Sequence, residues 1–105
     1  MTTLLKGNDI MIRQVGLTPE GVRVVANTFK MFDAYGLPLD IMLDLMKDNN
    51  MIPDWIDFCN EAMISGWKNK TIIDRVKDAV ETVYGTDFTK EVLSRLKLYI
   101  EHMPV

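Results

Sequence analysis

The sequence has little cysteine, little histidine and no long apolar run. Cys59 is the single cysteine, so no disulfide can form within the chain. His102 is the single histidine, so the Cys and His ligands of a zinc site are lacking. The first residues lack the apolar core of a signal peptide, and no apolar stretch approaches the ~20 residues of a membrane span. We therefore expect a protein without a membrane segment, located in the cytoplasm.

Motifs of catalysis are also missing. The sequence contains no glycine-rich phosphate loop, no Gly-x-Ser-x-Gly element and no Asp-x-Asp-x-Asn-Gly calcium loop. Cys59 follows Phe58 on an apolar helix face, where a buried and unreactive thiol is expected. His102 falls in the last turn of the final helix, where its cationic form interacts favourably with the helix C-terminus. We predict that the chain is not an enzyme and binds no metal or cofactor.

Glycine and proline divide the rest of the chain into segments of helical length, and none shows the strict alternation of a half-buried strand. With 48% hydrophobic and 26% charged residues, the 105-residue chain suits one globular domain, residues 1–105. We expect an all-α fold, a compact bundle of about five short helices with short connections. The expected helices span 18–36, 38–48, 53–65, 70–84 and 86–103, after residues 1–17, a peripheral arm or a short helix over 8–15.

The start of the first of these helices is assigned from a local signal. Thr18 is a favourable N-cap residue, and Pro19 suits the first helical position. Four apolar residues follow at spacings of three and four: Val22, Val25, Phe29 and Phe32. This spacing predicts one apolar face along the whole helix.

The two central helices, 38–48 and 53–65, have the lengths and the short connection of a helix-turn-helix. In a DNA-binding pair the second helix presents its early residues to base edges. Here these residues are Asp54, Trp55, Asp57 and Asn60. Only the asparagine suits adenine readout. Residues 31–66 hold seven acidic residues and one basic residue, so phosphates would meet uncompensated negative charge.

Basic residues near the start of the fourth helix offer an alternative nucleic-acid contact. They are Lys68, Lys70, Arg75 and Lys77. Asp74, Asp78 and Glu81 interleave with them at helical spacing, so an ordinary solvated face explains the same charges. The alternative function is a helix-turn-helix-type transcriptional regulator that uses this basic patch.

The preferred function rests on the acidic central segment. Asp40, Asp44 and Asp48 lie one turn apart, and the last two gain nothing from the helix dipole. A solvated face would account for them, but so would a surface for a positively charged partner. Methionines in the same segment suit an adaptable binding surface, although core filling is their commoner use. The proposed surface comprises Asp40, Asp44, Asp48, Met51, Asp57, Glu61 and Trp67.

We therefore predict a non-catalytic helical interaction module, a regulator, adaptor or inhibitor that binds another protein through this acidic, methionine-rich surface. Apolar residues outside the main helix faces point to self-association as well, with a homodimer favoured. These residues are Ile41, Leu45 and Leu98.

Overall fold

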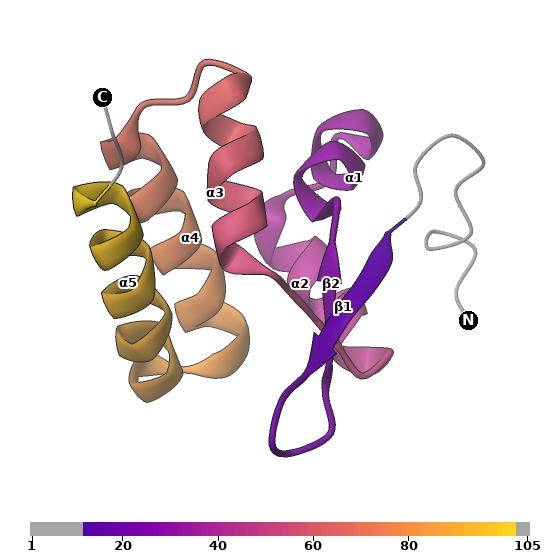
Figure 1. The fold of residues 1–105 in the computed structure, drawn as a ribbon. Helices are drawn as coiled ribbons and strands as arrows, with labels where there is room; N and C mark the ends of the chain where they lie inside the picture. The colour runs from indigo at the N-terminus through magenta and orange to yellow at the C-terminus, as the bar shows by residue number, and fades with distance from the viewer. Residues whose placement is uncertain (1–11, 103–105) are drawn as a thin grey trace.

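The computed structural model describes residues 12–102, which form an α+β fold (Figure 1). Over this range, five helices accompany a three-stranded sheet. In chain order the elements are β1 (Arg13–Leu17), β2 (Arg23–Ala26), α1 (Thr28–Tyr35), α2 (Leu39–Asp48), β3 (Met51–Pro53), α3 (Trp55–Ile64), α4 (Asn69–Tyr84) and α5 (Thr86–Glu101). The predicted all-α class is wrong, because three segments assigned to helices or turns are strands.

The largest correction concerns the predicted helix over 18–36. Its first half is the turn and second strand of a β-hairpin, and only Thr28–Tyr35 is helical. The Thr18 hydroxyl, expected to cap a helix, accepts a hydrogen bond from the Val22 N–H at 3.0 Å. The Thr18 carbonyl accepts another from the Gly21 N–H at 2.9 Å. Gly21 has φ +86, a left-handed conformation that glycine adopts without strain, so the chain reverses here.

The sheet joins local and distant segments. β1 pairs with β2 antiparallel, with a register shift between Gln14 and Gly16, and β2 pairs with β3 parallel. The short helix expected over 8–15 is also wrong where it can be checked, because Arg13 to Val15 belong to β1. Its first residues lie outside the described range.

The predicted helix-turn-helix is replaced by a different arrangement. α2 and α3 are connected through β3, which is hydrogen-bonded to β2 and buried. α2 packs mainly on α4, whereas α3 packs on α1 and α5. Pro53 therefore ends a strand rather than starting a helix, and Asp54 caps α3. The apolar residues from Met51 to Pro53 are buried between other elements. A solvent-exposed turn would leave them in contact with water.

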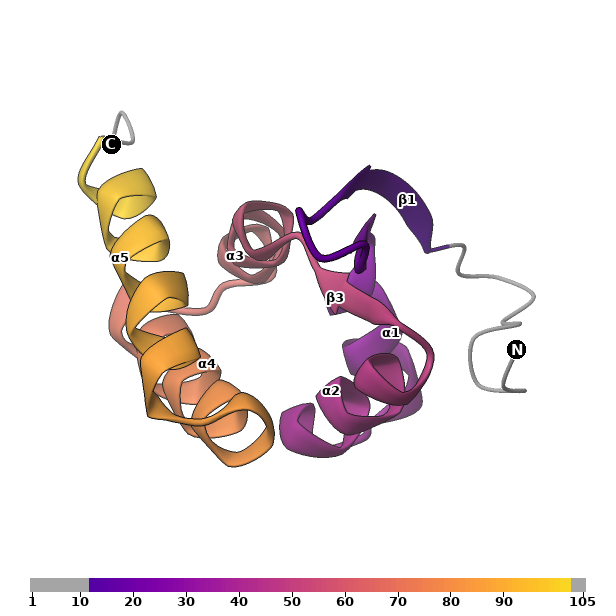
Figure 2. The ribbon, with the colours of Figure 1, turned by 90° about the horizontal axis from the view of Figure 1, so that it is seen from below.

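The core lies between the two helix groups. Seen from below in Figure 2, α1 and α2 lie on one side of the molecule and α4 and α5 on the other, with α3 and β3 between them. Phe58 of α3 is fully buried and stacks edge-on against Phe29 of α1, with ring centroids 5.2 Å apart. The fully buried face of α2 is formed by Met42, Leu43 and Met46. In the described part of the chain, no helix is both long enough and apolar enough to cross a membrane.

Candidate interaction groove

The small sheet uses its two faces differently. Val25 of β2 and Met51 of β3 belong to the core cluster. Their neighbours Val24 and Ile52 are paired with each other in register and point to the opposite face, because successive side chains of a strand alternate. Val24 and Ile52 both line a groove of about 560 Å³. On this second face Val24 is half-buried and Ile52 is 8% exposed, so the sheet is only partly open to the groove.

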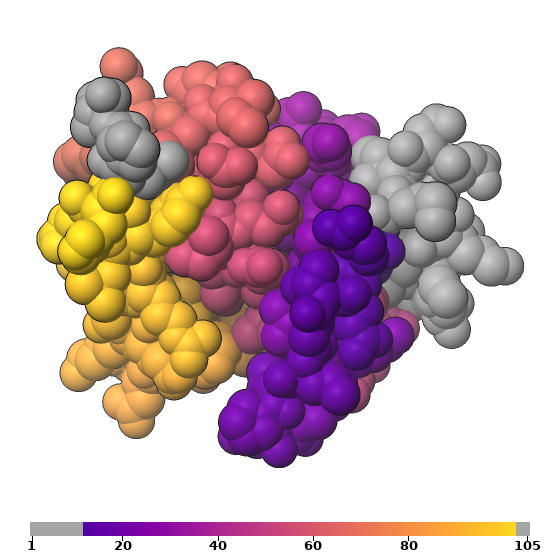
Figure 3. Space-filling model, in the orientation of Figure 1, coloured from indigo at the N-terminus to yellow at the C-terminus, as the bar shows by residue number. Residues whose placement is uncertain are grey.

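We call this cavity the hairpin groove. One wall is the β1–β2 hairpin, the other is α5, and the β3–α3 junction lies between them. Figure 3 shows the hollow between the indigo hairpin and the orange and yellow α5. The groove is lined by Leu17, Thr18, Pro19, Glu20, Val24, Ile52, Pro53, Asp54, Trp55, Ile56, Phe88, Glu91, Val92 and Arg95.

Apolar side chains of the groove remain in contact with solvent. Leu17 on the hairpin is 63% exposed, and Ile56 at the start of α3 is 37% exposed. Phe88 of α5 is half-buried. A concave, mostly apolar surface with a few polar groups is the usual form of a binding site. The exposed leucine and isoleucine lie on hydrogen-bonded elements, so their positions are set before any partner arrives.

Asp54 fixes the junction between β3 and α3. Its backbone N–H donates to the Val25 carbonyl at 2.8 Å, and its Oδ1 accepts from the N–H groups of Ile56 and Asp57 at 3.1 and 3.3 Å. These bonds satisfy two of the free donors at the start of α3. Asp54 therefore holds the first turn of α3, including Ile56, against the sheet.

Replacing this cap should measurably weaken the fold. Asp54→Ala is expected to lower the free energy of unfolding by about 1 kcal/mol, because two backbone N–H groups lose their acceptor. Asp87→Ala is the matched control, since Asp87 is a first-turn acid of α5 where no side-chain cap bond is present. The control should cost only a few tenths of a kcal/mol. Urea unfolding followed by circular dichroism measures both, and equal losses would contradict the capping role.

Trp55 lines the groove with an unsatisfied hydrogen-bond donor. Its side chain is mostly buried, 8% exposed, and its ring packs edge-on against Phe58 with centroids 5.8 Å apart. The indole Nε1 is inaccessible to solvent and has no hydrogen-bond partner among the residues that the structure describes. Leaving such a donor unpaired costs about 1–3 kcal/mol. The groove wall therefore contains a group that would gain from a nearby acceptor.

The charged residues of the groove are mainly acidic. Glu20 lies on the hairpin, Asp54 at the junction and Glu91 on α5, so each of the three sides contributes a carboxylate. Among the described residues that line the groove Arg95 is the one basic residue, and its Nη2 lies 3.1 Å from Oε1 of Glu91. The groove thus combines an apolar surface with a net negative charge.

No family model and no solved structure matches this chain. Its function therefore has to be inferred from its own surface and side chains.

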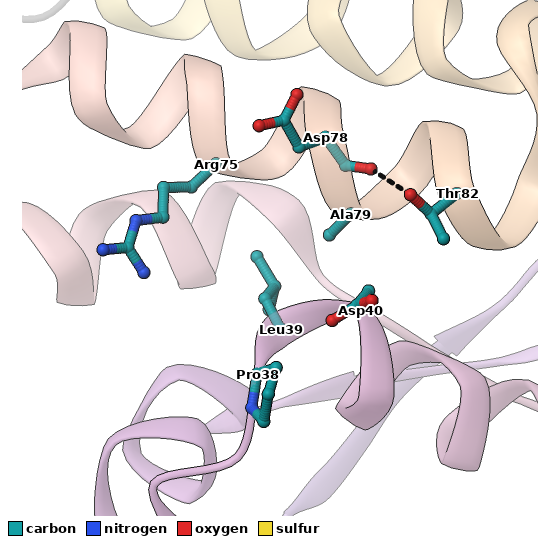
Figure 4. A pocket seen from close by; sticks show the side chains of 7 residues that line it. All are labelled: Pro38, Leu39, Asp40, Arg75, Asp78, Ala79 and Thr82. Atoms are coloured by element: carbon teal, nitrogen blue, oxygen red, sulfur yellow. Dashed lines mark hydrogen bonds between the residues drawn. The ribbon is translucent and has the colours of Figure 1, made fainter.

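A second, shallower cavity of about 300 Å³ lies between the start of α2 and α4 (Figure 4). The Thr82 hydroxyl in it donates to the backbone carbonyl of Asp78 at 2.8 Å. In Figure 4 the Arg75 guanidinium and the Asp78 carboxylate point in different directions. No cluster of His, Cys, Asp and Glu that could hold a metal ion is found in residues 12–102. The lining residues are Pro38, Leu39, Asp40, Arg75, Asp78, Ala79 and Thr82.

The acidic row on α2 lies partly beside α4, and its last two residues, Asp44 and Asp48, are exposed. Asp40 is half-buried and lines the second cavity. Asp44 is close enough to Tyr84 of α4 to help raise the pKa of that phenol. Asp48 is exposed at the end of α2.

The acidic residues of α3 lie elsewhere and make contacts within the protein. Oδ2 of Asp57 accepts a hydrogen bond from the Asn27 N–H at 2.9 Å, and Oε1 of Glu61 lies 4.0 Å from Nζ of Lys30. The first contact joins α3 to Asn27, which precedes α1, and the second joins α3 to α1 itself. Because α2 packs on α4 and α3 on α1, these acids do not extend the α2 row into one surface.

Met51 and Trp67, the other two residues of the predicted surface, are largely enclosed. Met51 is 4% exposed in β3. Trp67 is half-buried and packs edge-on against Phe29, with ring centroids 5.3 Å apart. Three further methionines of the central segment are also buried in the core: Met31, Met42 and Met46. The methionines of this segment therefore fill the core more than they form a surface.

The basic residues near the start of α4 do not gather on one side. Lys70 pairs with Asp74 at 3.0 Å, while the Arg75 guanidinium lies 5.1 Å from the ring centroid of Trp67. Five residues along a helix turn the side chain by about 140°, so Arg75 and Lys70 point in different directions. Lys77 lies nearly in line with Lys70 and is exposed, and Lys68 precedes the helix.

No residue of the predicted acidic surface or of the basic patch is among the described residues that line the hairpin groove, although Asp54 and Trp55, considered for base readout, do line it. Cys59, the other candidate for chemistry, is fully buried in α3. Burial raises the pKa of the Cys59 thiol and so disfavours the reactive thiolate. The groove was missed because its apolar residues carry no motif, and the alternation of Val24 and Ile52 becomes visible only once the strand register is known.

Proposed function

We propose that this protein is a non-catalytic interaction module, a regulator or adaptor, that holds a segment of another protein in the hairpin groove. The observation that carries the proposal is the groove itself, an apolar concavity of about 560 Å³ with Leu17 exposed on the hairpin and Ile56 exposed at the β3–α3 junction. Partner segments commonly anchor by inserting side chains into such pockets. A reducing cytoplasm, in which the free Cys59 stays a thiol, is the compartment that we propose.

This proposal keeps the class of function expected from the sequence but moves the contact surface. The acids on α3 already have partners in the protein, and the central methionines are mostly buried. The groove offers what they lack, namely apolar side chains that are both exposed and held in a concave arrangement. Burying such side chains is the main favourable term in most protein associations.

A charge placed in the groove should abolish this binding. Peptides selected from a random display library against the folded chain are expected to lose at least about tenfold in affinity for Ile56→Asp, because a carboxylate replaces an apolar anchor. Ile41→Asp is the matched control, since Ile41 is 46% exposed on α2, outside the groove. Its affinity for the same peptides should stay within twofold. Calorimetric titration measures both.

Two outcomes would contradict the proposal. One is a selection that yields only peptides insensitive to Ile56→Asp. The other is an equal loss of affinity for Ile41→Asp, which would indicate non-specific contact with any exposed apolar residue. Circular dichroism of both variants shows that the comparison is made between folded proteins.

Nucleic-acid binding is not proposed as a second function, because Lys70 and Arg75 point in different directions and carboxylates interleave with them.

Self-association stays a separate prediction. Within residues 12–102, the most exposed apolar side chains outside the groove are Ile64 of α3, 72% exposed, and Leu98 of α5, 57% exposed. Sedimentation velocity over a range of concentrations tests it.

A further inference from the structure

We infer that the segment held in the hairpin groove is basic and amphipathic, with lysine or arginine side chains beside the groove carboxylates and apolar side chains on Leu17, Val24 and Ile56. This inference rests on the proposed function and names the chemistry of its partner. Three observations carry it: the distribution of charge, the weak internal neutralisation of that charge, and the unpaired indole N–H.

The negative charge surrounds the groove. Glu20, Asp54 and Glu91 come from the hairpin, the β3–α3 junction and α5, so an occupant meets a carboxylate on every side. Opposite charges attract more strongly in a partly enclosed site than in bulk water, and like charges repel more strongly. The groove therefore selects against acidic segments and favours basic ones.

Little of the charge of Glu20 and Glu91 is neutralised by the protein itself, whereas the Asp54 carboxylate already accepts two backbone N–H bonds at the start of α3. Arg95 is paired with Glu91, but both side chains are exposed, at 72% and 59%, and an exposed pair one helical turn apart is weak. Glu20 makes no ion pair within residues 12–102. A lysine or arginine of the partner can thus replace or join Arg95 without breaking a strong contact.

Trp55 adds a reason to expect a polypeptide rather than a purely apolar ligand. Trp55 lines the groove, and its indole Nε1 is buried with no acceptor in the described range. Every residue of a peptide brings a backbone carbonyl, a strong acceptor, whereas an acyl chain brings none. A small movement of the ring on binding would pair this donor with a carbonyl of the occupant.

Three designed peptides with one shared leucine pattern test the inference. Their polar positions carry lysine, glutamine or glutamate, and calorimetric titration against the wild-type chain measures each affinity. The lysine peptide is expected to bind at least about tenfold more tightly than the glutamine peptide, and the glutamate peptide most weakly. In a Trp67→Phe background, Trp55 is the single tryptophan, so a change in its fluorescence reports occupation of the groove.

Charge reversal locates the effect. Glu20→Lys combined with Glu91→Lys is expected to lower the affinity for the lysine peptide at least about tenfold and to raise that for the glutamate peptide. Glu81→Lys combined with Glu101→Lys is the control, because both residues are exposed, neither lines the groove, and the change in net charge is the same. The control pair should lose much less.

The outcomes separate this inference from the proposed function. Equal binding of the lysine and glutamine peptides, both abolished by Ile56→Asp, would overturn the basic partner and leave the groove as a docking site. Binding of no peptide, or binding insensitive to Ile56→Asp, would overturn both. If Ile56→Asp instead disrupts a dimer in sedimentation velocity, the occupant is a second copy of the chain and the inference is wrong.

Discussion

Phe58→Ala is expected to lower the free energy of unfolding by about 3–5 kcal/mol. Phe58 is fully buried, and its ring contacts those of Phe29, Phe32 and Trp55 at centroid distances of 5.2, 6.2 and 5.8 Å. Removing the ring takes away the apolar burial and leaves a cavity that these neighbours cannot fill without moving. It also ends aromatic contacts that link α1 to α3 and, through Trp55, to the groove wall.

Phe58→Leu is the control, because it keeps most of the apolar volume and should cost less than about 1.5 kcal/mol. Guanidinium unfolding followed by far-ultraviolet circular dichroism measures both variants against the wild type. Domains of this size are stable by about 5–15 kcal/mol, so the alanine variant can be partly unfolded in buffer. The midpoint of its unfolding transition is therefore best measured at low temperature or with a stabilising osmolyte. A loss below about 1 kcal/mol would mean that this ring is not packed in the core.

The last four helices were predictable because their limits are set by local signals. Pro38 precedes α2, Gly66 follows α3 and Gly85 separates α4 from α5. Both glycines adopt positive φ, as expected where a helix ends or the chain turns. Within each helix the buried residues recur at spacings of three and four, so propensity, pattern and tertiary packing agree.

The hairpin was mispredicted because the same residues satisfy two patterns. Val25 in β2 and Phe29 and Phe32 in α1 are all buried, and their spacing fits one helix face although a strand ends between them. The sequence Thr-Pro-Glu-Gly from position 18 also suits a β-turn, with proline second and glycine fourth. The choice depends on β3, which pairs with β2 from more than 20 residues away and which local periodicity does not detect.

Two acids of the predicted surface, Asp57 and Glu61, make contacts within the protein. Asp57 and Glu61 connect α3 to the start of α1 and to Lys30, which the sequence could not reveal without the packing of these helices. The groove, by contrast, is assembled from residues 17–24, 52–56 and 88–95. Its parts meet only because the sheet places the hairpin beside the β3–α3 junction. Predicting the sheet is therefore a precondition for predicting the groove.

Stability should fall in alkaline solution because of Tyr84. Burial, and then the nearby carboxylate of Asp44, raise the pKa of Tyr84 to about 12 from its ordinary value of 10. Below pH 10 the phenol is neutral in the folded and unfolded states, and its full contribution to stability is present. As the pH rises from 10 toward 12, the unfolded chain ionises first, so that contribution is lost. The contribution of Tyr84 to the free energy of unfolding that is lost is about 2 kcal/mol, after allowing for solvent screening at a half-buried ring.

Tyr84→Phe isolates this effect. The difference between the two unfolding free energies removes every contribution that the two proteins share. We expect the wild type to lose about 2 kcal/mol more than Tyr84→Phe between pH 9 and 12, measured by urea unfolding at each pH. Asp44→Asn should reduce the loss, because it removes the second cause of the raised pKa. Parallel curves for the wild type and Tyr84→Phe would show that the phenol ionises equally easily in the folded and unfolded chain, and that α2 and α4 do not enclose it.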